Sequence, residues 1–216
     1  MNSRDTILQR IRKELADVPP VQQPPVPEVW PRTNASIGQL VERFADELQA
    51  VQGEIVRCRS MDEARRKLAE LMDHSQWKTI GSVDRPVCRE LAAEWEPQRV
   101  AWAEDDWEPS RLADLPAGMV AADRLLADTG TCLVTCEKPQ ERLMCYLPPV
   151  CIVVARTEQL AEHMPAAWDE IARRTAEPDR RGEFVLITGP SRTADIEKIL
   201  ILGVHGPKRL VVFLIE

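Results

Sequence analysis

Two nearly continuous apolar runs, VCIVVA over 150–155 and RLVVFLI over 209–215, most constrain how this chain can fold. A strand that is apolar at every position must be covered on both of its faces, which is typical of a parallel sheet flanked by helices. Shorter strand-like segments alternate along the chain with helical ones; among them are EIVRC, WKTIGS, RVAWA and GEFVLITG. The alternation predicts an α/β fold with a largely parallel sheet and helices on both faces.

The helical segments are recognised by apolar residues at helical spacing and by capping residues. In the segment 36–53, apolar side chains recur at helical spacing, and Gly53 follows as a stop. Ser60 and Glu63 form the pattern of a capping box at the start of the next helix. We expect a helix over 157–174 that Pro165 kinks or divides, and a short helix over 193–202, the segment TADIEKILIL.

The N-terminal region is expected to be an arm separate from the main fold. Residues 1–18 contain an amphipathic helix with Ile7, Ile11 and Leu15 on one stripe. The segment 19–35 has six prolines between Pro19 and Pro31, a density that favours an extended, semi-rigid linker. The main domain is then 36–216. Either the arm binds another subunit or its helix folds back onto its own domain; the sequence leaves both open.

Charge and hydropathy exclude several classes of protein. The net charge of −7 argues against general binding of nucleic acid or of anionic membranes, so any anion site must be local. No apolar run approaches the ~20 residues that span a bilayer. The N-terminus lacks the apolar stretch of a secretory signal, so we expect a cytoplasmic protein.

The cysteines and histidines do not form a recognisable metal site. No two of the six cysteines make a C-x-x-C pair; they are Cys58, Cys88, Cys132, Cys136, Cys145 and Cys151. Their spacing matches no zinc or iron–sulfur pattern, and several occupy apolar, strand-like contexts. We therefore expect free structural thiols, no metal and no cofactor. His74 and His163 are expected on helical surfaces, where they are incidental.

The first candidate site is LITGPSRTADIE, residues 186–197. A strand ends at Thr188, Gly189 and Pro190 turn the chain, and the expected helix then begins. Unpaired N–H groups at such a helix start attract anions, and Arg192 adds a forked donor for carboxylate or phosphate. Ser191 and Thr193 would be further anion ligands. The alternative is a helix cap made by Ser191 or Thr193, with Arg192 in solvent and Asp195 complementing the dipole.

The second candidate is Thr129-Gly130-Thr131, which leads directly into a strand. Gly130 permits a positive φ or a close backbone approach, and the flanking hydroxyls can donate to a ligand. These residues would form a wall facing Arg192. No G-x-G-x-x-G or Walker sequence occurs, so dinucleotide or nucleoside triphosphate binding by those loops is not expected.

The third candidate is GVHGP, residues 203–207, where two glycines leave His205 little cover. This imidazole is either a catalytic proton-transfer group or a structural surface residue. In open α/β sheets, ligands collect beyond the carboxyl ends of the strands, so we expect all three motifs at that edge. A ten-residue helix would separate Ser191 from His205 by roughly 15 Å, which weighs against a single site.

Four stretches together resemble the LUD domain, and more closely the lactate-utilization protein C family. They are LADTGTCLVT, Arg142-x₄-LPP before VCIVVA, ITGPSRTADIE and GVHGP. The resemblance implies a CoA-transferase/ribose-5-phosphate isomerase-like α/β fold. It also implies a place in a cytoplasmic three-part system that oxidises L-lactate to pyruvate, in which partner subunits carry the iron–sulfur motifs.

We therefore expect a subunit of such a system that binds a small carboxylate, a phosphate or a partner subunit at the carboxyl edge of its sheet. Asp195 would orient the site loop. One alternative is a stand-alone CoA transferase or sugar-phosphate isomerase, which needs a carboxylate as nucleophile or base; Asp128, Asp195 and Glu197 are the candidates. The other is a non-catalytic scaffold that uses the N-terminal arm to hold partners.

Overall fold

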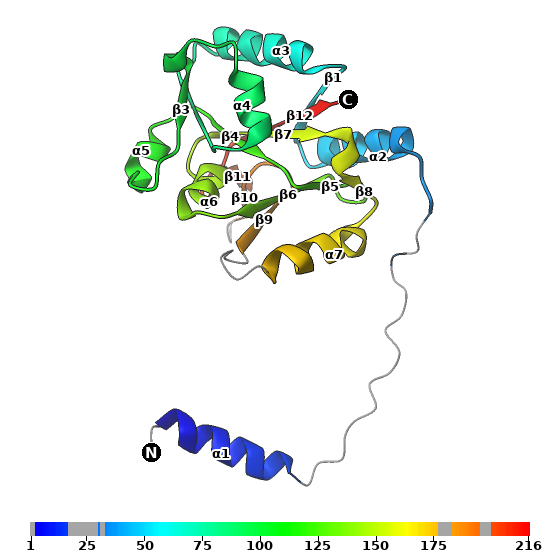
Figure 1. Ribbon diagram of the computed structural model, residues 1–216, viewed down its shortest axis with the longest axis vertical. Coiled ribbons are helices and arrows are strands. Elements are labelled where there is room, and N and C mark those ends of the chain that lie inside the picture. Colours follow the sequence, from blue (N-terminus) through cyan, green and yellow to red (C-terminus); the bar gives the residue numbers. More distant parts are fainter. Residues whose placement is uncertain (1–2, 17–29, 31–32, 177–182, 195–199) are drawn as a thin grey trace. The chain divides into compact units, whose positions relative to one another are not determined.

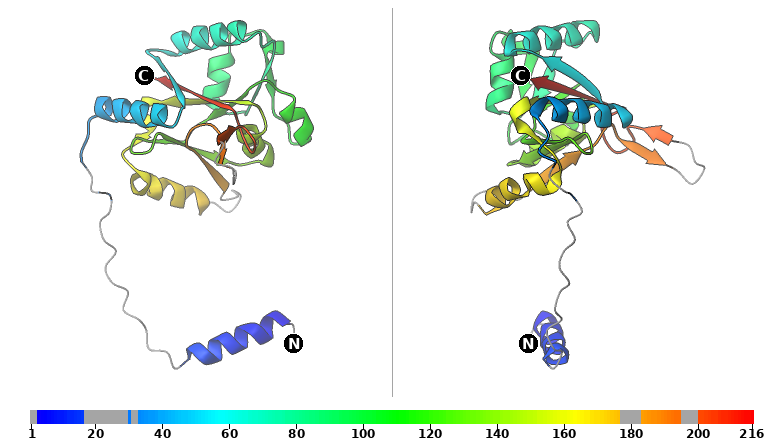
Figure 2. Two further views of the ribbon diagram at one scale, coloured as in Figure 1. Left: turned by 180° about the vertical axis from the view of Figure 1, so that it is seen from behind. Right: turned by 90° about the vertical axis from the view of Figure 1, so that its right-hand side faces the viewer.

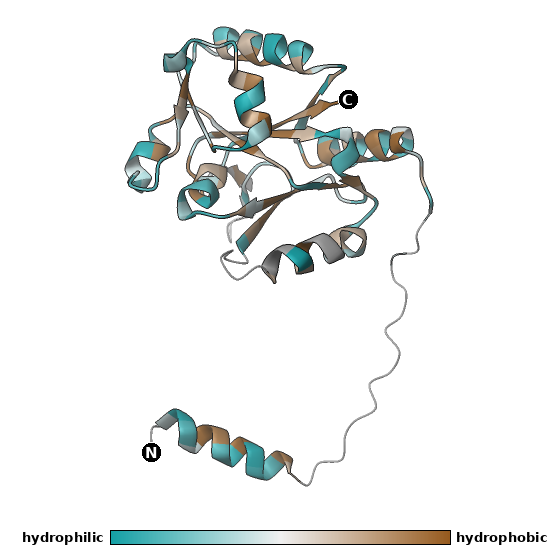
Figure 3. Ribbon diagram, viewed as in Figure 1, coloured by the Kyte–Doolittle hydropathy of each residue, from teal (hydrophilic) through white to brown (hydrophobic). Residues whose placement is uncertain are grey.

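The computed structural model describes residues 3–16, 30, 33–176, 183–194 and 200–216. The chain divides into two compact units, Met1–Pro31 and Arg32–Glu216. The described element of the first unit is the helix α1 (Ser3–Leu15), and none of its residues is buried. Ile7, Ile11 and Leu15 are therefore exposed, and an apolar stripe runs along the helix (Figure 3).

A six-stranded sheet forms the centre of the second unit (Figure 1). Its strands, in spatial order, are β1 (Glu54–Cys58), β12 (Arg209–Ile215), β7 (Val150–Arg156), β4 (Gly118–Ala121), β2 (Ile80–Ser82) and β3 (Val100–Trp102). Every neighbouring pair is parallel. The two apolar runs became the adjacent strands β7 and β12, which are buried along nearly their whole length. The prediction of a mostly parallel α/β sheet is confirmed.

Helices cover both faces of this sheet (Figures 1 and 2). Helices α3 (Met61–His74) and α4 (Pro86–Ala92) lie on one side, and α6 (Pro139–Tyr146) on the other. Helix α2 (Ile37–Ala50) precedes β1, and the short α5 (Pro109–Ala113) contacts α6. Half of the predicted capping box forms at α3: the Ser60 hydroxyl accepts a hydrogen bond from Glu63 N–H, but the Glu63 carboxylate accepts from Arg59 N–H rather than from Ser60. A complete capping box, which we had not predicted, joins Ser36 and Gln39 at the start of α2.

The sequence did not lead us to expect a second sheet. It has the order β8 (Leu160–Ala161), β5 (Arg124–Leu126), β6 (Thr131–Cys136) and β9 (Glu183–Ile187). Strand β6 is antiparallel to both of its neighbours. The turn over 127–130 sends the chain straight back along β5, which makes that pair antiparallel. Helix α7 (Met164–Thr175) covers its outer face, where Leu126, Leu133 and Ile171 make a small core.

We expected one long helix over 157–174, but residues 157–163 are not part of it. The chain makes a 3₁₀ turn over Thr157–Gln159, pairs briefly as β8, and enters α7 only at Met164. Pro165 consequently falls in the first turn of α7, where a missing N–H costs no intrahelical hydrogen bond. A second 3₁₀ turn, Pro97–Arg99, leads into β3.

The helix predicted over 193–202 is wrong for the residues that the structure describes there. They form a two-stranded antiparallel hairpin, β10 (Arg192–Ala194) and β11 (Leu200–Leu202), with Arg192 opposite Leu202. Thr193 lies opposite Ile201, and both are β-branched residues, which fit a strand better than a helix. The apolar spacing that suggests a helix is also compatible with a hairpin; Gly189 precedes this hairpin and Gly203 follows it, and both have positive φ. Asp195 and Glu197 lie outside the described residues.

Candidate functional site

The hairpin brings two of the three predicted motifs together. The backbone N–H of Ser191 donates to the carbonyl of Pro207 at 2.8 Å, and the N–H of Gly203 donates to the carbonyl of Ser191 at 2.9 Å. A Cβ atom on Gly206 would lie only 3.1 Å from Cβ of Ser191. Ser191 and the loop of His205 are therefore neighbours, and the separation of roughly 15 Å expected from a helix does not exist.

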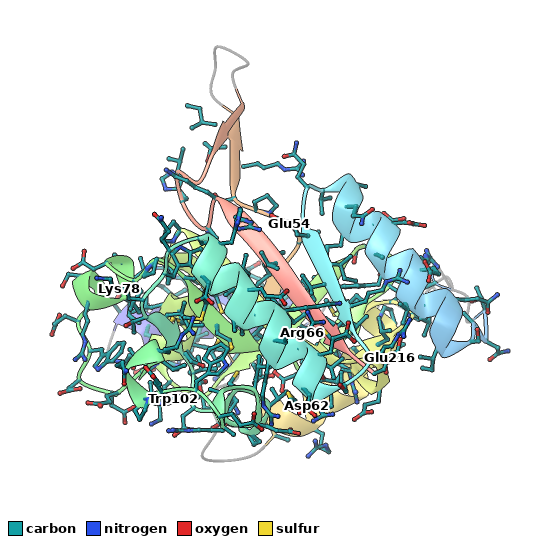
Figure 4. All side chains as sticks on the ribbon, turned by 90° about the horizontal axis from the view of Figure 1, so that it is seen from above. Glu54, Asp62, Arg66, Lys78, Trp102 and Glu216 are labelled. Carbon is teal, nitrogen blue, oxygen red and sulfur yellow. The ribbon has the colours of Figure 1, made fainter. Side chains whose placement is uncertain are left out.

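The edge of the sheet at which this pair of loops lies differs from our expectation. Residues 203–207 lead into β12 rather than follow it, and Lys208 N–H donates to the carbonyl of Pro149 just before β7. In Figure 4 the hairpin projects beyond the end of the sheet that carries Glu54, away from Glu216. The site is consequently at the amino edge of the parallel sheet. Thr188 does follow a strand end, but that strand is β9 of the second sheet.

The second motif, Thr129-Gly130-Thr131, is joined to the first through threonine hydroxyls. Pairing of β6 with β9 places Thr131 beside Thr188, with 2.7 Å between their Oγ1 atoms. Thr131 donates to Thr129 at 2.8 Å, and Thr129 donates to the Asp128 carboxylate at 3.2 Å. Because each hydroxyl has one proton, Thr188 must be the donor to Thr131. The three hydroxyl protons therefore all point in the same direction along this series of hydrogen bonds, which connects β6 to β9.

Two glycines of the motifs provide space for helix α2. Gly130 has φ +61°, and a Cβ atom there would lie 2.3 Å from the backbone nitrogen of Leu48. Gly189 has φ +82°, and its Cβ would lie 2.7 Å from the carbonyl oxygen of Val51. The prediction that Gly130 permits a positive φ and a close backbone approach is confirmed. The close neighbour is the carboxyl end of α2, so both glycines position the loops against that helix.

An open cleft lies beside His205. It has a volume of about 600 Å³ and is lined by Leu143, Tyr146 and Leu147 of α6 and its end, and by residues 203–206. Val204 and His205 are exposed, as is Tyr146, and partial burial raises the pKa of the Tyr146 phenol. The described lining thus combines an aliphatic wall with a phenol and an imidazole. The cleft thus offers an apolar surface next to two side chains that can donate or accept a hydrogen bond.

The other predicted anion ligands lie close to this loop pair in the chain. Arg192 is exposed at the start of β10, and Ser191 and Thr193 on either side of it are partly buried. Because β10 is a strand, these residues have no helix dipole behind them. Any attraction for an anion would come from the Arg192 guanidinium and from nearby hydroxyl and backbone N–H groups.

The LUD domain family model matches residues 41–215, which is most of the chain and includes all three motifs. The chain belongs to the LUD domain family. Residues 3–15, which form α1, precede the matched region.

Relatives of this LUD domain align with it over different lengths. It is 27% identical over 229 residues to an uncharacterized protein of Neisseria meningitidis serogroup B, covering all of this chain and 94% of that protein. It is 28% identical over 236 residues to lactate utilization protein C of an Exiguobacterium species, covering 100% and 97% of the two chains. Lactate utilization protein C of Bacillus pumilus is 36% identical over 111 residues, 50% of this chain and 46% of that protein.

A solved structure has the same fold. It is a crystal structure of a DUF162 family protein from Deinococcus radiodurans, with a TM-score of 0.65 and 17% sequence identity. The match covers 84% of this chain and 99% of that one. In the part of this LUD domain that the structure describes, no helix is both long and apolar enough to cross a membrane.

Sequence reasoning missed a partly buried arginine, Arg85, at the carboxyl edge of the LUD domain's parallel sheet. Arg85 follows β2, and its guanidinium donates to Glu137 at 2.8 Å, to Glu141 at 3.1 Å and to the carbonyl of Thr135 at 2.9 Å. Burial lowers the pKa of Arg85, but the charges of Glu141 and Glu137 outweigh it and raise that pKa. Two carboxylates thus already neutralise this cation, so it joins β2 to α6 rather than attracting a free anion. Only tertiary contacts reveal this, since Glu137 is 52 residues away.

His163 is not on a helical surface, contrary to our expectation. It is 5% exposed and immediately precedes α7, where its Nδ1 accepts a hydrogen bond from Ala166 N–H at 3.2 Å. His163 therefore caps the helix in the way that Ser or Asp usually does. The sequence signal for this cap was Pro165, since proline is favoured in the first turn of a helix and His163 lies just before that turn. His74 does occupy an exposed position at the end of α3.

The six cysteine side chains are buried in this LUD domain, as expected for structural thiols. Burial raises the pKa of Cys88 and of Cys151 to about 12, and it also raises the pKa of Cys132. The pKa of Cys145 is also raised, mainly by a hydrogen bond with Cys136 and secondly by burial. Among the described residues, no group of three or more His, Cys, Asp or Glu side chains is arranged to hold a metal ion.

Proposed function

We propose that this chain acts in lactate utilization, as a subunit of an iron–sulfur-dependent system that oxidises L-lactate to pyruvate in the cytoplasm. The similarity over the whole chain to lactate utilization protein C of Exiguobacterium supports the pathway. The proposal includes a CoA-transferase/ribose-5-phosphate isomerase-like classification of the fold, supported by the all-parallel central sheet. Redox centres would belong to partner subunits, and this chain would bind no cofactor.

The site that we propose for a small carboxylate or a partner's carboxylate is the loop pair joined at Ser191. The observation that carries this is the pair of backbone hydrogen bonds from Ser191 to Pro207 and from Gly203 to Ser191. Ser191 is thereby hydrogen-bonded to both ends of the loop that carries His205, and Arg192 is the next residue after Ser191. Arg192, with Ser191 and Thr193, would bind the carboxylate. Thr129 to Thr131 would support this loop from the start of β6. Asp195 would orient the loop.

In this scheme His205 is the proton acceptor. Oxidation of lactate to pyruvate releases two electrons and two protons. The imidazole of His205 would take one proton and water the other, and iron–sulfur centres of a partner would take the two electrons one at a time and pass them to an acceptor. An exposed imidazole in a loop can exchange its proton with water after each turnover.

Reconstitution tests the proposal. The chain would be purified with and without candidate iron–sulfur partner proteins, and lactate-dependent reduction of an electron-acceptor dye would be measured. We expect reduction only by the combination. Reduction of dye by this chain alone, or turnover of a CoA thioester or sugar phosphate by it, would favour the stand-alone enzyme.

Substitutions of Arg192 test the site itself. Losing a charge-assisted hydrogen bond costs roughly 1.5–3 kcal/mol, so Arg192→Ala should raise the lactate KM about tenfold or more. Arg192→Lys should recover only part of this, because an ammonium lacks the planar fork. Arg66→Ala, which removes an exposed arginine of α3, is the matched control and should leave KM unchanged. If Arg192→Ala instead lowers the melting temperature and leaves KM unchanged, Arg192 is structural.

A further inference from the structure

The cleft beside His205 is larger and more apolar than lactate alone requires. Its volume is about 600 Å³, within the range of roughly 300–1,000 Å³ that holds typical organic ligands. Lactate carries a single methyl group beyond its carboxylate and hydroxyl, so it would leave most of this space unfilled. The lining of the cleft therefore bears on which acids the proposed site accepts.

One wall of the cleft is a strip at the end of α6. Tyr146 and Leu147 lie three and four residues after Leu143, a spacing that places all three side chains on one face of the helix. Leu143 and Leu147 are only half-buried, and Tyr146 is 39% exposed. The part of each leucine that the core leaves uncovered forms an aliphatic surface that a ligand can contact.

The fold holds both walls of the cleft in place. Met144 of α6 is fully buried, and a Cβ atom on Gly118 would lie 2.7 Å from its Sδ atom, so α6 packs directly on β4. The opposite wall is the loop 203–206, whose two ends are hydrogen-bonded to the backbone of Ser191. The cleft is thus preformed, and a ligand that enters it has little loop ordering to pay for.

The polar groups of the cleft indicate which apolar ligand suits it. Burial raises the pKa of Tyr146, so its phenol is protonated at neutral pH and can donate a hydrogen bond. The neutral imidazole of His205 can accept one. A hydroxyl group both accepts and donates, so it can satisfy the two side chains together. Arg192, the residue after Ser191, supplies a cation for a carboxylate.

We propose that this cleft holds the aliphatic side chain of a 2-hydroxycarboxylate, and that the site favours 2-hydroxy acids whose side chains are longer than that of lactate. The inference rests on the proposed function and narrows its substrate class, with lactate as a short member. Arg192 binds the carboxylate, and Tyr146 and His205 contact the 2-hydroxyl group. Leu143 and the other aliphatic residues of the cleft cover the hydrocarbon chain.

Calorimetric titration of the full chain tests the inference. The probes are L-lactate and its straight-chain homologues L-2-hydroxybutyrate, L-2-hydroxyvalerate and L-2-hydroxycaproate. We expect the affinity to rise about two- to fourfold with each added methylene group, because burying a methylene is favourable. Hexanoate has the chain and carboxylate of 2-hydroxycaproate without the hydroxyl, and it should bind about three- to tenfold more weakly.

Three results of this titration would overturn the inference. The first is an affinity that does not change with chain length, and the second is the absence of binding by any of these acids. The third is binding of hexanoate as tight as that of 2-hydroxycaproate, because the cleft would then select simple fatty acids.

A pair of matched variants locates the hydrocarbon chain. Leu143→Gln makes the cleft wall polar at similar volume, and Leu71→Gln changes a half-buried leucine of α3 that packs on the same core but does not line the cleft. The ratio of the 2-hydroxycaproate affinity to the lactate affinity should fall about threefold or more in Leu143→Gln and stay within about twofold in Leu71→Gln. An unchanged ratio in Leu143→Gln would contradict the inference. If melting shows that Leu143→Gln does not fold, Val204→Thr gives the same comparison, because Val204 is 47% exposed.

The reconstituted system separates this inference from the proposed function. If the system oxidises lactate but binding does not depend on chain length, the inference is wrong and the proposed function stands. If the longer acids bind as expected but neither they nor lactate reduce the dye, the proposed function fails, and the cleft remains a binding site for 2-hydroxy acids.

Discussion

The backbone N–H of Ser191 donates a hydrogen bond to the carbonyl of Pro207 at 2.8 Å, across the base of the β10–β11 hairpin. This contact joins the end of the second sheet, which leads into the hairpin, to the loop that enters the central strand β12. The two sheets and helix α2 therefore meet around the same loops that carry Arg192 and His205. Substitutions here test stability and function separately.

Replacing Gly130 by alanine should destabilise the LUD domain strongly. The new Cβ would overlap the backbone of Leu48 in α2 and occupy a φ of +61° that alanine rarely adopts. Overpacking against backbone and an unfavourable φ together predict a loss of about 3 kcal/mol or more in the free energy of unfolding, measured by urea denaturation. Gly38→Ala is the control, since nothing lies within 4 Å of its Cβ and it is inside α2. It should stabilise the protein by about 0.5–1 kcal/mol. Equal stability of the two variants would contradict the close packing of Gly130.

Thr131→Val should weaken the connection between β6 and β9. The substitution keeps the shape of the side chain but removes the hydroxyl that contacts both Thr129 and Thr188. Since Thr131 is buried, we expect a loss of about 1–3 kcal/mol in thermal or urea unfolding. Thr79→Val removes an exposed hydrogen bond to the carbonyl of Gln98 and should cost about 0.5 kcal/mol, because water replaces it. A loss no larger than that of Thr79→Val would show that the threonine chain contributes little.

Arg85→Met should be one of the most destabilising changes on the surface of this sheet. It leaves Glu137 and Glu141 without their shared cation, and the Glu141 side chain is only 10% exposed. Removing one partner of a buried ion pair typically costs about 3–5 kcal/mol. Arg57→Met removes a pair with Glu42 that is largely in solvent and should cost at most about 1 kcal/mol. Calorimetric melting of both variants measures the difference. A small loss of stability for Arg85→Met would show that the ion pairs of Arg85 contribute little to the stability of the fold.

The buried thiols predict how stability depends on alkaline pH. Cys88 and Cys151 have pKa values raised to about 12 by burial, whereas a cysteine in the unfolded chain ionises near pH 8.5. Above that pH the unfolded state loses protons that the native state keeps, so the free energy of unfolding must fall as pH rises toward 12. The slope for each thiol reaches about 1.4 kcal/mol per pH unit. Urea denaturation at pH 8, 9 and 10 should show this decline.

The same thiols should be unreactive in the native protein. At pH 8 an aromatic disulfide reagent should modify fewer than one cysteine per chain, and all six in denaturant, because the six side chains are buried. A Cys88→Ala and Cys151→Ala double variant should show a shallower alkaline decline than the wild type. Rapid modification of the native chain would show that the thiols are accessible.

The sequence by itself determined the α/β class, the parallel central sheet, the starts of α2 and α3, and the burial of the cysteines. These depend on short-range patterns: apolar runs that demand cover on both faces, and serines that cap the helix that follows them. The positive φ of Gly130 could also be anticipated, because few other residues tolerate it.

Only the tertiary structure decided that residues 192–194 and 200–202 pair as a hairpin, because strand pairing outweighs a spacing that fits a helix equally well. It also decided that Ser191 meets Pro207 at the amino edge of the sheet, and that Arg85 finds Glu137 and Glu141. These contacts join residues up to 56 positions apart, and no local pattern records which distant backbone or carboxylate a side chain will meet.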